Sequence, residues 1–159
     1  MKNKLVLGLG SNLGNRYAYI YQAVLQIQLA LENKGQLSGI YSSPPWGETN
    51  QPSFLNAAFA IETDKNVEHC FSTIKNIEKE LGRIHTKRWG PRCIDIDILF
   101  FNEDILETEN LCIPHKNIAE RAFVLAPLVD LIPNFEHPIT KKTMVQLLQN
   151  LENNCSLFS

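Results

Sequence analysis

Apolar residues recur along this chain with two periods, and the alternation between them predicts the order of its secondary structure. Short apolar runs bounded by turn residues are typical of strands and cover residues 4–10, 36–42, 54–63 and 93–101. Steps of three and four residues predict a second helix over residues 66–81 and a first amphipathic helix whose stripe is Tyr17, Ile20, Val24, Ile27 and Leu31. The resulting β-α-β-β-α-β order indicates an α/β (α+β) fold with a ferredoxin-like core.

The pattern weakens after residue 102. Residues 105–106 and 111–113 predict short strands, and residues 143–151 predict a closing helix. Between them lies a stretch that we expect to be irregular because four prolines interrupt it: Pro114, Pro127, Pro133 and Pro138. We find no repeat and no linker, so residues 1–159 are expected to form a single domain with a C-terminal extension.

The charge balance limits the classes of partner. The chain has 15 basic and 17 acidic residues and a net charge of −2, which argues against a large nucleic-acid surface. The positive charge is local instead, because five basic or partly basic side chains lie within ten residues: Arg83, His85, Lys87, Arg88 and Arg92. A solvated loop is the ordinary interpretation of such a cluster. A pair of acidic residues that follows it directly favours a functional one.

Cysteine use and apolar runs bear on location. None of Cys70, Cys93, Cys112 and Cys155 is spaced as Cys-x-x-Cys, so we expect reduced thiols and no structural zinc site. We see no signal peptide, and no apolar run approaches the ~20 residues of a membrane span. These features predict a cytoplasmic protein without a membrane partner. The short chain without coiled-coil heptads favours a monomer.

The segment of residues 88–98, Arg-Trp-Gly-Pro-Arg-Cys-Ile-Asp-Ile-Asp-Ile, is the strongest candidate for chemistry. Residues two apart in a strand point to the same side, so Asp95 and Asp97 project together with Cα atoms ~6–7 Å apart. Two carboxylates at that spacing can hold one or two Mg²⁺ ions, and the arginines upstream suit phosphate oxygens. Together they predict transfer of a nucleotide phosphate. The alternative is that both aspartates merely solvate one face of an edge strand.

The chain at this point resembles the 6-hydroxymethyl-7,8-dihydropterin pyrophosphokinases of folate synthesis. The motifs that carry the resemblance are separated along nearly the whole chain: Gly10-Ser11-Asn12-Leu13-Gly14, Tyr41 through Gly47, Gln51 through Asn56, Arg88 through Leu99, Ile113-Pro114-His115 and Arg121-Ala122-Phe123. The resemblance implies a ferredoxin-like fold. It also implies transfer of pyrophosphate from ATP to the pterin hydroxymethyl group, with release of AMP.

The resemblance also assigns roles to individual residues. Asp95 and Asp97 are expected to hold two Mg²⁺ ions, and Arg83 and Arg92 to take part in catalysis. The residues expected to bind ATP are Glu78, Arg83, Trp89, Arg92, Ile98, His115 and Arg121. Those expected to bind the pterin are Ser43, Pro44, Trp46, Phe54, Asn56 and Phe123. More ordinary interpretations stay open: a solvated helix position for Glu78, a turn for His115, and core packing for Phe54 and Phe123.

Some positions depart from the family pattern. His85 stands where a second arginine is frequent, and a histidine is only partly charged near neutral pH. Lys116, Asn110 and Cys112 also differ, which leaves the adenine and ribose contacts open. We expect residues 83–91 to close over Mg-ATP and pterin, with Trp89 covering the nucleotide.

Two other classes of function remain to be weighed. A β-α-β-β-α-β sheet is also the frame of RNA-recognition modules, but such a module needs aromatic and basic residues on its central strands. A regulatory domain that holds pterin or nucleotide without chemistry is the second alternative. Residues 5–10 of the first strand include no such residue, and the aspartates of the fourth strand would repel RNA phosphates. The paired aspartates and nearby arginines argue against the regulatory domain.

Overall fold

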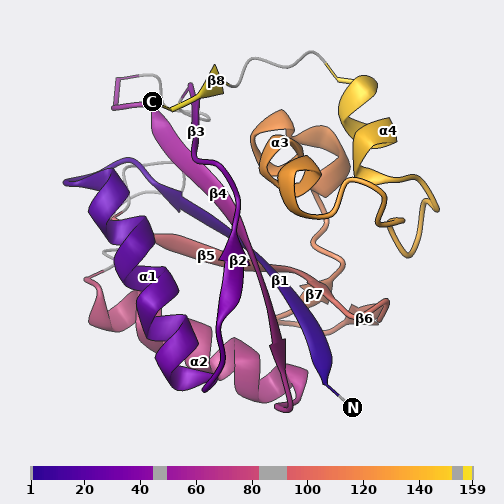
Figure 1. Ribbon diagram of the computed structural model, residues 1–159, viewed down its shortest axis with the longest axis horizontal. Coiled ribbons are helices and arrows are strands. Elements are labelled where there is room, and N and C mark those ends of the chain that lie inside the picture. The colour runs from indigo at the N-terminus through magenta and orange to yellow at the C-terminus, as the bar shows by residue number, and fades with distance from the viewer. Residues whose placement is uncertain (1, 45–49, 83–92, 152–155, 159) are drawn as a thin grey trace.

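The computed structural model of the chain describes residues 2–44, 50–82, 93–151 and 156–158 (Figure 1). Its strands are β1 (Asn3–Ser11), β2 (Gly35–Leu37), β3 (Tyr41–Ser43), β4 (Phe54–Thr63), β5 (Asp95–Phe101), β6 (Leu106–Glu107), β7 (Cys112–Ile113) and β8 (Ser156–Leu157). Its helices are α1 (Arg16–Ala30), α2 (Val67–Glu80), α3 (Ala122–Leu131) and α4 (Met144–Gln149), with a 3₁₀ turn at Ile118–Glu120. No helix in these ranges is both long enough and apolar enough to span a membrane.

The main sheet is antiparallel and confirms the predicted ferredoxin-like order. Its strands run β5-β1-β4-β3-β8, with β2 also pairing with β4, and β6 and β7 form a separate hairpin. The first strand along the chain therefore lies between the last two long strands, as it must when two β-α-β units interlock. β5, which begins with Asp95, lies at one end of this order.

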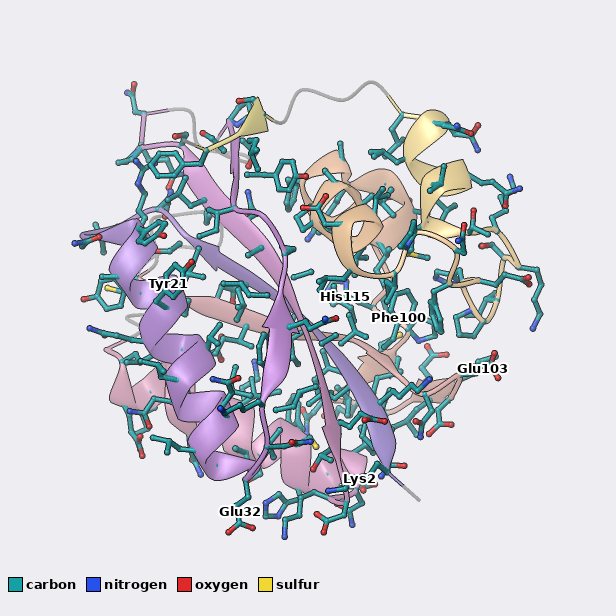
Figure 2. The ribbon with its side chains drawn as sticks, in the orientation of Figure 1. Lys2, Tyr21, Glu32, Phe100, Glu103 and His115 are labelled. Carbon is teal, nitrogen blue, oxygen red and sulfur yellow. The ribbon has the colours of Figure 1, made fainter. Side chains whose placement is uncertain are left out.

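The two faces of the sheet are covered by different helices (Figure 1). One face packs against α1 and α2 around a large cluster that includes Leu7, Phe59 and Ile96. The other face packs against α3 and α4 around a smaller cluster that includes Leu125 and Phe100, which Figure 2 labels. Successive strand residues alternate between these faces. The second cluster covers only part of its face of the sheet. The candidate site lies on the part of that face that the cluster leaves uncovered.

Side-chain caps define where the helices begin. Asn15 accepts a hydrogen bond from the Ala18 backbone N–H at the start of α1, and Asn66 does the same for His69 at the start of α2. Such caps satisfy amide groups that the helix itself cannot. Asn12, three residues before the α1 cap, is buried and makes side-chain hydrogen bonds to the chain before β4.

The prediction of an irregular stretch after residue 113 is wrong in one respect, because α3 forms there with Pro127 inside it. A proline in a helix removes one backbone hydrogen bond and normally breaks the helix. Here the helix also buries Leu125 and Leu128 completely against the sheet. The gain from burying those side chains, about 2 kcal/mol each, offsets the lost hydrogen bond.

The predicted second strand is split into β2 and β3. Ser38 lies at the break, where its backbone N–H donates to the Ala58 carbonyl and its Oγ accepts from the Ala58 N–H. The hydroxyl thus replaces a backbone acceptor, which lets both short strands pair with β4.

Candidate active site

Asp95 and Asp97 lie near the start of β5, beside two positions of β1 that are glycines. The register pairs Asp95 with Gly10 and Asp97 with Gly8, so all four residues face the same side of the sheet. This is the side on which α3 and α4 pack, beyond the end of their cluster. Both aspartates are half-buried. Gly8 and Gly10 contribute no side chain to this face, and the Leu99 side chain lies over Gly8; we call this strip beside the carboxylates the glycine trough.

Burial and a neighbouring negative charge change the protonation of Asp97. The pKa of Asp97 is raised to about 7, chiefly by burial and then by the charge of Asp95, with Glu78 adding to the rise. Lys75 and Arg121 act in the opposite direction. A negative centre that the described cations only partly neutralise is suited to binding a divalent cation. Within the described ranges no group of three or more His, Cys, Asp or Glu side chains could hold a metal ion.

Glu78, on the last turn of α2, is almost fully buried and holds the edge of β5. Its Oε2 accepts a hydrogen bond of 2.7 Å from the backbone N–H of Ile96, the residue between the two aspartates. Its Oε1 lies 3.1 Å from Lys75 Nζ, in an ion pair on the same helix. The solvated helix position considered for Glu78 is therefore wrong. The carboxylate instead satisfies an edge amide that β1 cannot reach.

A cavity of about 280 Å³ lies beside Asp97, between α2 and the segment that follows β6. Its lining joins the two predicted nucleotide contacts Ile98 and His115 to further side chains, which include Phe71, Lys75 and Leu111. The predictions from sequence had not singled out Phe71, Lys75 or Leu111. Phe71 also packs at the margin of the core, so its apolar character in the sequence does not distinguish a cavity wall from a core position. A cavity with apolar walls and a few polar groups is typical of a small-molecule site.

His115 lines this cavity, with its Nε2 3.9 Å from Asp97 Oδ2. Burial and the nearby Arg121 charge lower the pKa of His115 below its ordinary value, and Asp95 opposes them. The imidazole is therefore neutral near pH 7. It offers a hydrogen bond to a bound group rather than a positive charge.

Asn56 and Ser43 form a polar pair on the far side of the glycine trough. Asn56 on β4 pairs with Gly10, and its Nδ2 donates to Ser43 Oγ at 2.7 Å. Both side chains are buried. A Cβ on Gly10 would lie 3.3 Å from Asn56 Oδ1 and 3.8 Å from the ring of Phe54, so both side chains face the trough. The structure thus brings three of the predicted pterin residues together.

Two residues near this pocket were not assigned a role from sequence. Asn12 Nδ2 donates to Gln51 Oε1 at 2.7 Å and to the Pro52 carbonyl at 3.2 Å. Arg16 Nη1 donates to the backbone and side chain of Ser53. These bonds fix the chain entering β4, which carries Phe54 and Asn56. The motif around Gln51 was recognised, but its contact with Asn12 depends on the tertiary structure.

Some of the remaining predicted residues lie within the described ranges, and the others lie outside them. Arg121 and Phe123 lie at the start of α3, where the guanidinium carbon is 5.7 Å from the centre of the Phe123 ring. Phe123 is half-buried, on the helix that packs against β3 and β4. Pro44 directly follows β3. Trp46, Arg83, Trp89 and Arg92 lie outside the described residues, as does the predicted closing loop, so their roles stay predictions.

Comparison with known proteins identifies a family of enzymes. A family model described as 7,8-dihydro-6-hydroxymethylpterin-pyrophosphokinase (HPPK) matches residues 6–133. The 2-amino-4-hydroxy-6-hydroxymethyldihydropteridine pyrophosphokinase of Aquifex aeolicus (strain VF5) is 40% identical over 138 residues, which cover 87% of this chain and 86% of the relative. The protein of that name from Bacillus subtilis (strain 168) is 43% identical over 141 residues, which cover 88% and 84%.

Longer proteins contain a similar segment. The folic acid synthesis protein fol1 of Pneumocystis carinii is 37% identical over 145 residues, which cover 91% of this chain but 20% of the relative. A crystal structure of Plasmodium falciparum HPPK-DHPS with pteroate superposes with a TM-score of 0.75 at 18% identity, over 94% of this chain and 42% of that one. The chain thus spans less than half of that solved structure, and the likeness supports the fold.

Proposed function

The chain belongs to the 7,8-dihydro-6-hydroxymethylpterin-pyrophosphokinase family, and on that premise we propose how its residues perform the family's reaction. It is a pyrophosphokinase of folate biosynthesis, which transfers pyrophosphate from ATP to the hydroxymethyl group of 6-hydroxymethyl-7,8-dihydropterin and releases AMP. This membership favours an enzyme over the RNA-recognition and regulatory alternatives. The proposal takes residues 1–159 as one pyrophosphokinase domain that acts in the cytoplasm.

The proposal rests on a row of three residues that crosses neighbouring strands of the sheet. Asp95, Gly10 and Asn56 are paired across three neighbouring strands and face the same side. Neighbouring strands lie ~4.8 Å apart, so about 10 Å separates the acidic end of the row from its amide end. The side-chain-free position between them leaves room for the reacting groups of both substrates. A pterin against Asn56 would therefore present its hydroxymethyl group toward the phosphates held near Asp95.

The aspartate pair fits Mg²⁺ binding. Burial and the charge of Asp95 together raise the pKa of Asp97 to about 7, and a cation beside the carboxylates would relieve the repulsion between them. We assign Asp95 and Asp97 as the residues that would hold two Mg²⁺ ions. When bound, such ions neutralise phosphate charge and acidify a nearby hydroxyl group.

The pterin is oriented by polar groups in the sheet and by aromatic rings. Asn56 can both donate and accept hydrogen bonds at the edge of a flat heterocycle, and Ser43 Oγ holds that amide in place. Phe54 and Phe123 are assigned to the two faces of the ring, with Pro44 and Trp46 at the rim. Because Asn56 is buried, an amide there that lost its partner would be costly, which favours a ligand able to satisfy it.

The nucleotide is assigned to the cavity beside Asp97. Ile98 and Phe71 provide apolar walls, and neutral His115 provides a hydrogen bond. Arg121 and the predicted phosphate contacts Arg83 and Arg92 would neutralise charge, with Trp89 over the nucleotide. Glu78, expected from the resemblance to bind ATP, is assigned instead to holding β5.

A coupled assay for AMP formation tests the proposal. AMP should form from ATP only when both the dihydropterin and Mg²⁺ are present. Asp97→Ala should lower kcat/KM by about 100-fold or more, because it removes one of the two carboxylates that would hold Mg²⁺. Asp104→Ala, at an exposed position just beyond the same strand, is the matched control. Turnover without Mg²⁺, or equal activity of the two variants, would contradict the assignment.

A further inference from the structure

β3 is a short strand near one end of the main sheet, and it carries Ser43 of the predicted pterin pocket. Of its three side chains, Tyr41–Ser43, only that of Ser43 is buried. Ile40, which precedes the strand, reaches the core, whereas Pro44, which follows it, has no backbone N–H for pairing. Burial of apolar surface therefore contributes little to the position of the end of this strand, and polar contacts contribute more.

Helix α3 holds β3 through one carboxylate. The Tyr41 hydroxyl lies 2.8 and 2.9 Å from the two oxygens of Asp130 and donates to that carboxylate. The Gly39 N–H, two residues earlier, donates to Asp130 Oδ2 at 3.0 Å. An ionised carboxylate accepts several hydrogen bonds, so it can hold a side chain and a backbone amide together. Because Phe123 lies near the start of the same helix, these bonds also relate Phe123 to the strand that carries Ser43.

β8 holds the other edge of β3 (Figure 1). β4 pairs with one edge of β3, and β8 pairs with Tyr41 and Ser42 from the other. The Phe158 N–H, directly after β8, donates to the Ile40 carbonyl at 2.7 Å. Without β8 this edge would leave its backbone groups to water. β8 lies beyond residues 6–133, the part of the chain that the family model matches.

The two contacts meet at Gly39. A Cβ at this position would lie 2.9 Å from Asp130 Oδ2 and 2.9 Å from the Leu157 side chain. Contacts that short force the neighbouring atoms to move, and both atoms lie at the ends of flexible side chains. An alanine would therefore displace Asp130 and Leu157 together at a small cost in stability, from a position four residues before Ser43.

We propose that Asp130 and residues 156–158 form a clasp on β3 that positions the pterin-binding side chains. Ser43 Oγ accepts a hydrogen bond of 2.7 Å from Asn56 Nδ2, so a shift of β3 turns the amide assigned to the edge of the pterin. The clasp lies outside the contacts assigned to substrates and acts through Ser43 and Asn56. Its members are therefore positioning residues, and the inference rests on the proposed function, which assigns the pterin to this pocket.

Steady-state AMP formation by the full chain, with calorimetry for each substrate, tests the clasp. Gly39→Ala and Asp130→Ala should each raise the KM for the dihydropterin about fivefold, the effect of about one hydrogen bond, and leave kcat and the ATP dissociation constant within about twofold. Asp130→Asn keeps one oxygen as an acceptor and should recover part of the pterin affinity. Asp104→Ala, which removes an exposed carboxylate beyond β5, should behave as the wild type.

Two comparisons separate positioning from a general effect on stability. Phe158→Ala loses the aromatic ring, whereas Phe158→Pro also loses the N–H that donates to Ile40. Phe158→Pro should therefore raise the pterin KM about threefold above that of Phe158→Ala. In an Asn56→Ala background, Asp130→Ala should have no further effect on pterin affinity, because the amide through which the clasp acts is absent.

The outcomes distinguish the clasp from the proposed function. An unchanged pterin KM in both Gly39→Ala and Asp130→Ala would overturn the clasp and leave the proposed function intact. An Asp130→Ala effect that persists undiminished in the Asn56→Ala background, or that falls equally on kcat and ATP affinity, would also overturn it. A wild-type protein that neither binds the dihydropterin nor forms AMP would refute the proposed function and the clasp together.

Discussion

Removal of the Glu78 carboxylate should loosen the strand that carries both aspartates. The hydrogen bond from the Ile96 N–H to Glu78 Oε2 is 2.7 Å long and buried, and it lies between Asp95 and Asp97 along the chain. In Glu78→Ala this amide loses its acceptor in a place that water reaches poorly. Glu78→Gln keeps an oxygen at the same position but loses the charge.

The expected size follows from the kind of bond that is lost. A hydrogen bond to a charged group contributes about 1.5–3 kcal/mol, and a neutral one about 1 kcal/mol. The partner Lys75 has a side chain that is 44% exposed, so its lost ion pair adds little. We expect Glu78→Ala to lose about 2 kcal/mol of local stability, which corresponds to roughly 30-fold faster exchange of the Ile96 amide hydrogen. Glu78→Gln should lose about 1 kcal/mol, or roughly fivefold.

Hydrogen exchange followed by NMR measures this effect residue by residue. The Ile96 amide should accelerate more than the amide of Leu7 in the central strand β1, which would respond only to global unfolding. Glu80→Ala, on the exposed side of the same helix, removes the same charge without touching β5 and should leave both rates unchanged. The affinity of Glu78→Ala for Mg²⁺ should also fall, because its two ligands are no longer held together.

Two results would refute this reasoning. Unchanged protection of the Ile96 amide in Glu78→Ala would show that the carboxylate does not hold the strand. A raised dissociation constant for ATP in Glu78→Gln, with normal Ile96 exchange, would support the direct nucleotide contact that the resemblance suggested.

Three further changes probe the trough and its charges. Asn56→Ala should raise the pterin dissociation constant about tenfold in calorimetry and leave ATP affinity near the wild-type value, because it removes the edge contact; equal losses for both ligands would contradict this. Gly10→Ala should also weaken pterin binding selectively, since its Cβ would lie 3.3 Å from Asn56 Oδ1; an unchanged pterin affinity would count against the trough. The pKa of Asp97 is about 7 instead of 3.8, so the metal-free folded state loses stability as pH rises from about 4 to about 7. Asp97→Asn should therefore melt a few degrees above the wild type at pH 8 and at the same temperature near pH 4, and equal melting temperatures at pH 8 would reject the shift.

Local patterns in the sequence predicted much of the fold. The bounds of β4 agree with the prediction at both ends, and α2 differs by one residue at each end. These elements follow from spacings of two and three to four residues, which neighbouring residues fix by themselves. The prediction that Asp95 and Asp97 project from the same side of one strand follows for the same reason.

The predictions that were wrong came from sequence patterns that allowed two interpretations. Apolar residues surround most of α1, so spacing alone did not show that Tyr17 faces outward while Ile20 faces inward. Pro127 argued against α3 locally, and only the burial of Leu125 and Leu128 against the sheet outweighs it. In both cases the deciding contact comes from another part of the chain.

The sequence by itself determined the order of the core elements, the acidic pair and the family to which the chain belongs. Only the tertiary structure decided that Asn56 lies across Gly10 from Asp95 and that Glu78 accepts a hydrogen bond from the Ile96 amide. It also decided that apolar side chains of α1 such as Tyr17 and Leu25 face solvent. The physical reason is that strand register and helix contacts join residues far apart in the chain. Their energies depend on which groups meet, and a local pattern does not contain that information.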